Sequence, residues 1–540
     1  MRTPALRLPR GWLAWPIVAV ALVLLNASLT FANVWPTPKV RWQNALSIEL
    51  AVCVLLLSLL PPAAGSVLRR MLPALWLALV VGHYLDVTAP GLYGRDFNLY
   101  WDAPHLGNVI AMISEAAPTW QLVLAGVAAL LAVTLAYVLS GVALGWVGDG
   151  AERPRLRPVL VSLAIAVVAV FTTQQVTSPE RPALVFADPV IPAYAQQVRS
   201  VVAMLGPGAV QPSLGASPAA LAISPDGLGG SDVYLIFVES YGAIAFEAPA
   251  FAAALAPSRA AFESAVRDTD RLVVSAYVES PTFGASSWLA HLSLISGISV
   301  RDQYSYQSLM VQQRETLGTT FARAGYRTVA LMPGMRQAWP EGAFYRYDAM
   351  YGRDELAYTG PRFGWWSIPD QYALAKLDAL EGPHGSRPPL FVVFPTSTTH
   401  APFGPVAPYQ PDWSKVLTAD AYDPEEVARI LARTPDLTNL SADYLHAMSY
   451  EFTTFAGYLR ERATDELTMI LVGDHQPPAA VSGKDAPWTV PVHIVTPNRH
   501  VSDRLLAQGF RAGATPARPS LGEMHELVPI LLSSFAEPRE

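Results

Sequence analysis

Cysteine is nearly absent from this chain of 540 residues, in which Cys53 is the only one. A single cysteine cannot form an intrachain disulfide framework, and it cannot supply a cluster of thiolate metal ligands. Any metal ion that the chain binds is therefore expected to use oxygen and imidazole ligands.

Charged residues are also few, since they make up 15% of the chain while hydrophobic residues make up 51%. This balance is too apolar for an ordinary soluble protein, so part of the chain is expected to lie in lipid. Lys and Arg (37) are outnumbered by Asp and Glu (44), and the net charge is -7. A basic surface for nucleic acid is not indicated, and nucleic acid is not an expected partner.

Long apolar stretches occur in the first third of the chain. Five of them approach the roughly 17 to 25 residues that cross a bilayer, at 12–32, 45–60, 72–87, 122–146 and 159–172. We therefore expect five membrane-spanning helices. The second and third stretches contain Glu49, His83 and Asp86, and ionisable groups inside a membrane are functional candidates. They leave a transporter function open, although we find no inverted repeat to support one.

Basic residues in the connecting segments indicate the orientation, because Lys and Arg are retained on the cytoplasmic side. With the N-terminus inside, eight basic residues lie inside and three outside: Arg2, Arg7, Arg10, Arg69, Arg70, Arg153, Arg155 and Arg157 against Lys39, Arg41 and Arg95. The N-terminus is thus expected in the cytoplasm and the C-terminal half outside. The first apolar stretch is not followed by a convincing small-residue cleavage site, which favours an uncleaved anchor.

Composition divides the chain into a transmembrane domain at 1–175, a linker at 176–230 that is rich in Pro, Ala, Gly and Gln, and a globular domain at 231–540. The linker contains a candidate short helix near 193–205. In the globular part, helical patterns alternate with the strand candidates "VYLIFVES", "RLVVSAYV", "RTVALMPG", "PLFVVFPTS", "LTMILVGDH" and "VPVHIVTP". Continuous apolar strands separated by helices predict an α/β fold with a mainly parallel sheet covered by helices on both faces.

Polar residues follow three of these predicted strands. Glu239 ends the first strand, Asp474 and His475 end "LTMILVGDH", and "PLFVVFPTSTTH" runs on to His400. Ligands of parallel sheets bind beyond the carboxyl ends of the strands. Two carboxylates and an imidazole suit a divalent cation such as Zn²⁺ or Mn²⁺, although each residue alone has a structural alternative, such as a helix cap.

The segment "PTFGASSWLAHLSLISG" adds a candidate nucleophile. Ser286 and Ser287 stand where an apolar-periodic helix begins. One serine can simply cap this helix. The helix N-terminus also presents N–H groups that favour a phosphoryl group, and a nearby metal would lower the pKa of a hydroxyl.

The ordered motifs "VESYG", "PTFGASSWLAHLSLISG", "FYRYD", "TSTTHAPF" and "LVGDHQPP" resemble the sulfatase-like branch of the alkaline phosphatase superfamily. Membrane members of this branch include lipoteichoic acid synthase, glucan phosphoglycerol transferases and, more distantly, phosphoethanolamine transferases. The resemblance covers about residues 232–535. Five spans before an extracytoplasmic catalytic domain also match the layout of lipoteichoic acid synthase.

The resemblance implies one divalent metal ion, Mn²⁺ or Zn²⁺ with Mg²⁺ as an alternative, held by Glu239, Asp474, His475 and the nucleophile. Counting back from the final Gly297 of the serine segment places the nucleophile at Ser287, with Ser286 as the runner-up. His291 stands where the family usually has Glu.

Two further residues match substrate-binding positions of the family. His400 matches a histidine that contacts the phosphoryl group or protonates the leaving oxygen. Arg346 in "FYRYD" matches an arginine that binds phosphate or a glycerol head group. A surface arginine is the alternative for Arg346, since Arg is common both on surfaces and at phosphates.

The residues around the serines also bear on the reaction. A sulfatase needs "C/S-x-P-x-R", and here "WLAH" follows the serines without the Pro or the Arg. The resemblance therefore implies a phosphotransferase that moves a phosphoglycerol- or phosphoethanolamine-type head group from a phospholipid to a glycan, lipid or other hydroxyl acceptor. It also implies a bacterial inner-membrane protein with a periplasmic or extracytoplasmic catalytic domain. A hydrolase with the same site and a catalytically inactive membrane scaffold are the alternatives.

Overall fold

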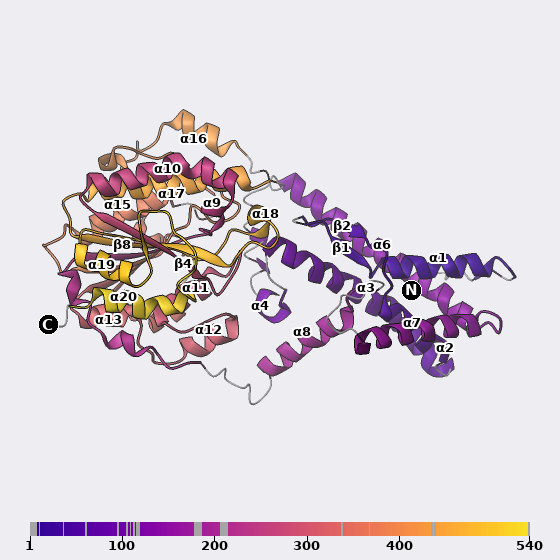
Figure 1. Cartoon of the computed structure of the whole chain (residues 1–540). Coiled ribbons are helices and arrows are strands. Elements are labelled where there is room, and N and C mark those ends of the chain that lie inside the picture. The colour runs from indigo at the N-terminus through magenta and orange to yellow at the C-terminus, as the bar shows by residue number, and fades with distance from the viewer. Residues whose placement is uncertain are drawn as a thin grey trace. The chain divides into compact units, whose positions relative to one another are not determined.

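A computed structural model describes residues 8–9, 11–35, 37–59, 62–93, 97–103, 106–107, 110–111, 114, 119–177, 186–205, 214–335, 339–364, 366, 368–433, 436 and 439–537. The chain forms two compact units (Figure 1), one with residues 1–110 and 117–209 and one with residues 111–116 and 210–540. The first unit is mostly helical, and the second contains the large sheet.

Apolar helices make up most of the first unit. Its elements are α1 (Ala14–Ala27), β1 (Phe31–Asn33), β2 (Val40–Trp42), α2 (Ile48–Leu59), α3 (Pro62–Tyr93), α4 (Leu99–Asp102), α6 (Thr119–Ala151), α7 (Arg157–Thr177) and α8 (Val190–Leu205). Among the described residues, three helical stretches are long and apolar enough to cross a membrane: 70–91 within α3, α6 and α7. The first two predicted spans form the shorter helices α1 and α2, of 14 and 12 residues. A count of five crossings therefore stays a prediction.

Two of the ionisable residues in the predicted spans have hydrogen-bond partners within this unit. The buried Glu49 carboxylate accepts hydrogen bonds from the Ser47 hydroxyl at 2.7 Å and from the backbone N–H of Val190 at 2.6 Å. Because Val190 begins α8, Glu49 satisfies a free N–H at that helix end. His83 Nε2 lies 2.9 Å from the Phe31 carbonyl oxygen. Both contacts give these side chains a structural role.

An eight-stranded sheet lies at the centre of the second unit. Its order is β10 (Arg511–Ala512), β4 (Leu272–Glu279), β9 (Thr489–Thr496), β8 (Leu467–Gly473), β3 (Asp232–Val238), β7 (Leu390–Pro395), β5 (Arg327–Leu331) and β6 (Ala349–Tyr351). From β8 to β6 each neighbouring pair is parallel, whereas β9 is antiparallel to both of its neighbours and β10 is antiparallel to β4. The prediction of a mainly parallel sheet is confirmed.

Helices cover both faces of this sheet, as Figure 1 shows. Alternate residues of β3 pack into opposite cores: Tyr234 and Ile236 join one core, and Val233 and Leu235 join the other. The first core is closed by α10 (Pro249–Asp268), α15 (Asp370–Glu381) and α17 (Ser441–Glu461). The second is closed by α11 (Ser287–Ser296), α13 (Leu317–Arg323), α19 (Arg499–Ala507) and α20 (Leu527–Phe535). This double burial is the reason that the strands read as continuous apolar runs.

A fully buried histidine lies on β9, away from the strand ends. The Ser275 hydroxyl donates to the Gly513 carbonyl at 2.6 Å, so it accepts from His493 Nδ1, which lies 2.7 Å away. His493 Nε2 then accepts from the Tyr241 hydroxyl at 2.8 Å. Burial, and secondarily the charge of Arg259, lower the pKa of His493 to about 3. The fold thus holds the neutral imidazole.

The lowered pKa of His493 predicts that the folded protein becomes less stable in acid. Between pH 6.5 and about 3, the unfolded chain binds a proton at His493 and the folded chain does not. Stability therefore falls by about 1.4 kcal/mol for each pH unit below 6.5, and at pH 5 we expect a clear drop in the melting temperature of the full chain in detergent. The change in melting temperature from pH 7 to pH 5 should be smaller in His493→Gln. Equal changes in the two proteins would contradict the prediction.

Candidate active site

The carboxyl ends of three neighbouring strands bring the predicted site residues to one edge of the sheet. In the parallel ladder Val238 pairs with Gly473, and Phe237 pairs with Pro395. Glu239, which follows β3, therefore lies beside Asp474 after β8 and near Thr396 after β7. The Thr396 hydroxyl accepts a hydrogen bond from the Glu239 backbone N–H at 3.1 Å.

Small residues allow the turns after β3 and β8 to approach closely. A Cβ atom on Gly473 would lie 1.8 Å from the Tyr241 carbonyl oxygen, so glycine is needed there. Ser240 has a φ of 57°, in the left-handed region, and its N–H donates to Asp474 Oδ1 at 2.8 Å. The Ser240 hydroxyl donates to Glu239 Oε1 at 3.0 Å. Both carboxylates are thereby fixed by the same turn.

Ser287 contacts this carboxylate cluster from the first position of α11. Its hydroxyl donates to Glu239 Oε2 at 2.8 Å and lies 3.1 Å from His475 Nε2. Ser286 is the N-cap of the same helix, with a left-handed φ of 64° and no side-chain capping bond. The structure therefore brings Glu239, His475 and Ser287 into direct contact.

The tautomer of His475 follows from its hydrogen bonds. Nδ1 lies 2.7 Å from the carbonyl oxygen of Gln476, which can only accept, so Nδ1 carries the hydrogen. The lone pair of Nε2 then faces Ser287 and Glu239 Oε1, the latter at 3.4 Å. This is the arrangement of a histidine that binds a metal through one nitrogen and a backbone carbonyl through the other.

Burial and neighbouring charges perturb the pKa values of the cluster in different directions. Burial, followed by the Asp474 charge, raises the pKa of Glu239. Burial also opposes the ionisation of Asp474, but the charges of His475 and His291 outweigh it and lower the pKa of Asp474. Burial likewise opposes the charged form of His475, yet Asp474 and Glu239 raise its pKa overall. Two buried carboxylates this close call for a compensating positive charge.

The donor set fits a divalent metal ion. Glu239, Asp474 and His475 each offer one ligand atom, and these three atoms lie within 4.8 Å of one another. Asp474 Oδ2 is buried and receives no hydrogen bond. An acidic oxygen that is dry and unpartnered is explained by a cation. Oxygen and imidazole ligands suit Zn²⁺, Mn²⁺ and Mg²⁺ to different degrees.

His291 joins this cluster, although the sequence indicated only that it replaces the family's Glu. It lies one helical turn after Ser287, so both face the strand ends. Its Nε2 is 3.7 Å from Asp474 Oδ2, and both atoms are buried without a hydrogen bond. The four-residue spacing from the nucleophile candidate was the signal in the sequence that could have identified this neighbour.

Loss of the His291 side chain is expected to weaken metal binding. A ligating carboxylate is oriented by the polar groups around it, and His291 Nε2 lies 3.7 Å from Asp474 Oδ2. Removing such a neighbour typically costs about 10- to 100-fold in metal affinity. We predict a loss of this size for Mn²⁺ or Zn²⁺ in His291→Ala, measured by calorimetry, with partial recovery in His291→Gln. His500→Ala, on the exposed side of α19, is the control. Unchanged affinity in His291→Ala would show that Asp474 needs no support from this residue.

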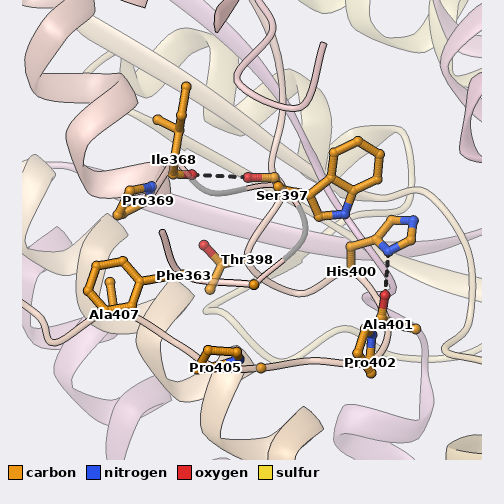
Figure 2. Close-up of a pocket in the computed structure, with 13 residues that line it drawn as sticks. Phe363, Ile368, Pro369, Ser397, Thr398, His400, Ala401, Pro402, Pro405 and Ala407 are labelled. Carbon is orange, nitrogen blue, oxygen red and sulfur yellow. Dashed lines mark hydrogen bonds between the residues drawn. The ribbon is translucent and has the colours of Figure 1, made fainter. Parts of the chain in front are cut away.

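His400 lines a pocket, which Figure 2 shows. Its ring contacts Trp366 edge to face, with centroids 4.8 Å apart, and its charge acts on Glu239. Nδ1 lies 2.7 Å from the Ala401 carbonyl oxygen and so carries a hydrogen, which leaves Nε2 available for a ligand. The pocket is lined by aromatic, proline and hydroxyl side chains, among them Phe363, Ser397 and Thr398.

Arg346 makes different contacts. Half of its side chain is exposed, and its guanidinium donates to the Arg314 carbonyl at 2.8 Å and lies 3.6 Å from Glu315. Its φ of 55° places it on a turn between the buried Tyr345 and the partly buried Tyr347. The contacts described for Arg346 do not include Glu239, Asp474, His475 or Ser287, so its role in substrate binding stays a prediction.

Part of the chain matches a family model. Residues 276–493 match the model of the family described as Sulfatase. No curated protein matched the chain. Structures similar to this one include the lipoteichoic acid synthase LtaP of Listeria monocytogenes, with 12% identity, a TM-score of 0.35 and coverage of 59% of this chain and 79% of that chain.

Two further structures are similar over comparable lengths. The phosphoglycerol transferase GacH of Streptococcus pyogenes, in complex with sn-glycerol-1-phosphate, has 11% identity, a TM-score of 0.36 and coverage of 59% and 88%. The C-terminal periplasmic domain of EptC from Escherichia coli, in complex with Zn, has 13% identity, a TM-score of 0.34 and coverage of 55% and 80%.

Proposed function

We propose that this chain, whose residues 276–493 match the Sulfatase family model, is a membrane-anchored, metal-dependent phosphotransferase. It moves a phosphoglycerol- or phosphoethanolamine-type group from a phospholipid to a hydroxyl acceptor through a covalent phospho-Ser287. One observation carries this proposal: the Ser287 hydroxyl, at the N-terminus of α11, lies between Glu239 and His475 at 2.8 and 3.1 Å.

Glu239, Asp474, His475 and Ser287 would hold one divalent ion, with Mn²⁺ or Zn²⁺ favoured by the mixture of oxygen and nitrogen donors. When bound, such an ion supplies positive charge that stabilises a serine alkoxide and the phosphoryl oxygens. The buried, unpartnered Asp474 Oδ2 supports this assignment.

Ser287 and His400 then have separate roles in the reaction. Ser287 Oγ gives its proton to Glu239, which it already contacts, and attacks phosphorus, so that an Oγ–P bond forms while the bond from phosphorus to the diacylglycerol oxygen breaks. His400 donates a proton from Nε2 to the departing alcohol and is left neutral. In the second half, His400 takes the proton of the acceptor hydroxyl as that oxygen attacks phosphorus, the bond from Ser287 Oγ to phosphorus breaks, and Ser287 Oγ recovers its proton from Glu239. The N–H groups that begin α11 favour the negative phosphoryl group in both halves.

We assign Arg346 to the phosphate or the glycerol head of the substrate, because an arginine on a turn exposed to solvent can reach a bound anion. The apolar helices of the first unit support a lipid donor, since they would keep the site near a bilayer. Phosphatidylglycerol and phosphatidylethanolamine are the simplest donors. The catalytic domain is then extracytoplasmic, in a bacterial inner-membrane protein whose N-terminus is cytoplasmic.

Mass spectrometry of the full chain in detergent tests the proposal. After incubation with each lipid and Mn²⁺ or Zn²⁺, we expect an added glycerophosphate or phosphoethanolamine mass on the peptide that carries Ser287, together with released diacylglycerol. Addition of an acceptor alcohol should discharge the adduct into a new phosphodiester, whereas discharge only into water would identify a hydrolase. If neither lipid released diacylglycerol and wild type and Ser287→Ala behaved alike, the lipid-donor reaction would be wrong.

A further inference from the structure

Two buried carboxyl groups lie behind the loop that carries His400. Asp370 begins α15, and Glu451 lies in the middle of α17. Both side chains are 0% exposed. Neither residue belongs to the cluster around Glu239, and the reaction proposed above does not use either.

Asp370 holds the loop by accepting hydrogen bonds from four donor groups. The backbone N–H groups of Ser397 and Thr398 donate to its carboxylate at 3.0 and 2.7 Å, and the hydroxyl groups of the same residues donate at 3.2 and 2.5 Å. Two of these partners are backbone N–H groups, which can only donate, so the oxygens of Asp370 accept from the loop.

Unlike Asp370, Glu451 has no hydrogen-bond donor bonded to its carboxyl oxygens. Neither of its oxygens accepts a hydrogen bond. Asp370 and Thr398 are the neighbouring groups that influence the pKa of Glu451. The hydroxyls of Tyr450 and Tyr422 nearby are buried and have no described hydrogen bond. No cationic side chain is among the groups described around Glu451. A second unpaired carboxylate next to Asp370 would be very costly in this dry environment.

We infer that Glu451 is held as a neutral carboxylic acid that donates its proton to Asp370, and that this acid–carboxylate pair positions the 396–400 loop. The shared proton gives one Glu451 oxygen a partner, removes the negative charge from the other, and leaves Asp370 able to accept from the loop. Burial, followed by the charge of Asp370, raises the pKa of Glu451, in agreement with this state.

Hydrogen bonds at the two ends of the 396–400 loop connect the pair to the site. At one end the Thr396 hydroxyl accepts from the Glu239 N–H at 3.1 Å, and at the other the His400 N–H donates to the Ser397 carbonyl at 3.2 Å. The backbone of His400 is thereby tied to a residue that Asp370 holds directly. The pair is therefore a positioning device for His400 rather than a catalytic group, and this role rests on the proposed function of the site.

A buried cation between the two carboxyl groups is the competing arrangement. It would satisfy the Glu451 oxygens, but among the described residues no third His, Cys, Asp or Glu lies close enough to these two carboxyl groups to complete a cation site. The acid–carboxylate pair and the cation site predict different effects of Glu451→Gln. In Glu451→Gln the new side-chain amide can donate to Asp370 as the acid does, whereas it cannot replace a carboxylate in a cation site.

The test compares Glu451→Gln and Glu451→Leu in the full chain, with Glu461→Gln at the exposed end of α17 as the matched control. Infrared spectroscopy should show a carboxylic-acid C=O band that both Glu451 variants lose and the control keeps. Hydrogen exchange at the Ser397 and Thr398 amides should stay slow in Glu451→Gln and become faster in Glu451→Leu. With a lipid donor, kcat should stay within about two-fold in Glu451→Gln and fall about 10- to 100-fold in Glu451→Leu, with metal content unchanged.

The inference is overturned if the band persists in Glu451→Gln, if exchange at the loop rises equally in both variants, or if wild type holds a second cation that Glu451→Gln loses. The infrared and exchange measurements need no turnover. A wild-type protein that transfers nothing would therefore refute the proposed function while these two measurements still decide the state of Glu451.

Discussion

Replacement of Ser287 by alanine is expected to lower turnover of the lipid donor by on the order of 10³-fold or more, because the variant has no oxygen that can form the covalent intermediate. The Ser287 hydroxyl is the one placed 2.8 Å from Glu239 and 3.1 Å from His475. Diacylglycerol release and the mass of the serine peptide measure the loss. The melting temperature should change little, since Ser287 is only partly buried.

Ser286→Gly is the matched control for this variant. Ser286 has a φ of 64°, which glycine adopts without strain, so the control removes a hydroxyl while it keeps the backbone turn. We expect most of the activity to remain. If Ser286→Gly lost activity and Ser287→Ala kept it, Ser286 would be the nucleophile and the assignment proposed above would be wrong.

The second large effect is expected from Asp474→Asn, which keeps the size of the side chain and removes its charge. Asp474 is 0% exposed and offers its unpartnered Oδ2 to the cluster. We expect loss of stoichiometric Mn²⁺ or Zn²⁺ by elemental analysis and a fall in turnover comparable to that of Ser287→Ala. A ligand that binds only the folded state stabilises it by about 2.7 kcal/mol at 100 times its dissociation constant. Added metal should therefore raise the melting temperature of wild type and not that of the variant.

Asp268→Asn, at an exposed position on α10, is the control for a general effect of removing one carboxylate. Its metal content and turnover should equal those of wild type. A wild-type protein that holds no divalent metal, together with full function in Asp474→Asn, would favour a membrane scaffold over an enzyme.

Local patterns in the sequence were sufficient to predict much of the second unit. The six predicted strands correspond to β3, β4, β5, β7, β8 and β9, and the predicted helix that begins at the serines is α11. These elements have long apolar runs or clear periodicity, which are local signals. The short strands β6 and β10 were not predicted, because strands of three and two residues carry almost no periodic signal.

The direction of β9 was also not predicted. Its sequence "VPVHIVTP" is buried on both faces like that of a parallel strand, yet it pairs antiparallel with β8 and β4. Burial on both faces depends on the covering helices, not on strand direction, so the apolar run cannot distinguish the two cases.

The Sulfatase match confirms the family resemblance that the ordered motifs indicated.

The sequence by itself determined which chemical groups stand at the strand ends: Glu239 after one strand, and Asp474 with His475 after another. Adjacent residues and strand ends are local properties, so the sequence is enough to specify them. Only the tertiary structure decided which serine meets these groups, that His291 lies 3.7 Å from Asp474, and that Asp370 and Glu451 form a buried pair behind the His400 loop. Each of these contacts joins residues from separate elements, and their distances depend on strand register, on the close approach at Gly473 and on how α11, α15 and α17 pack.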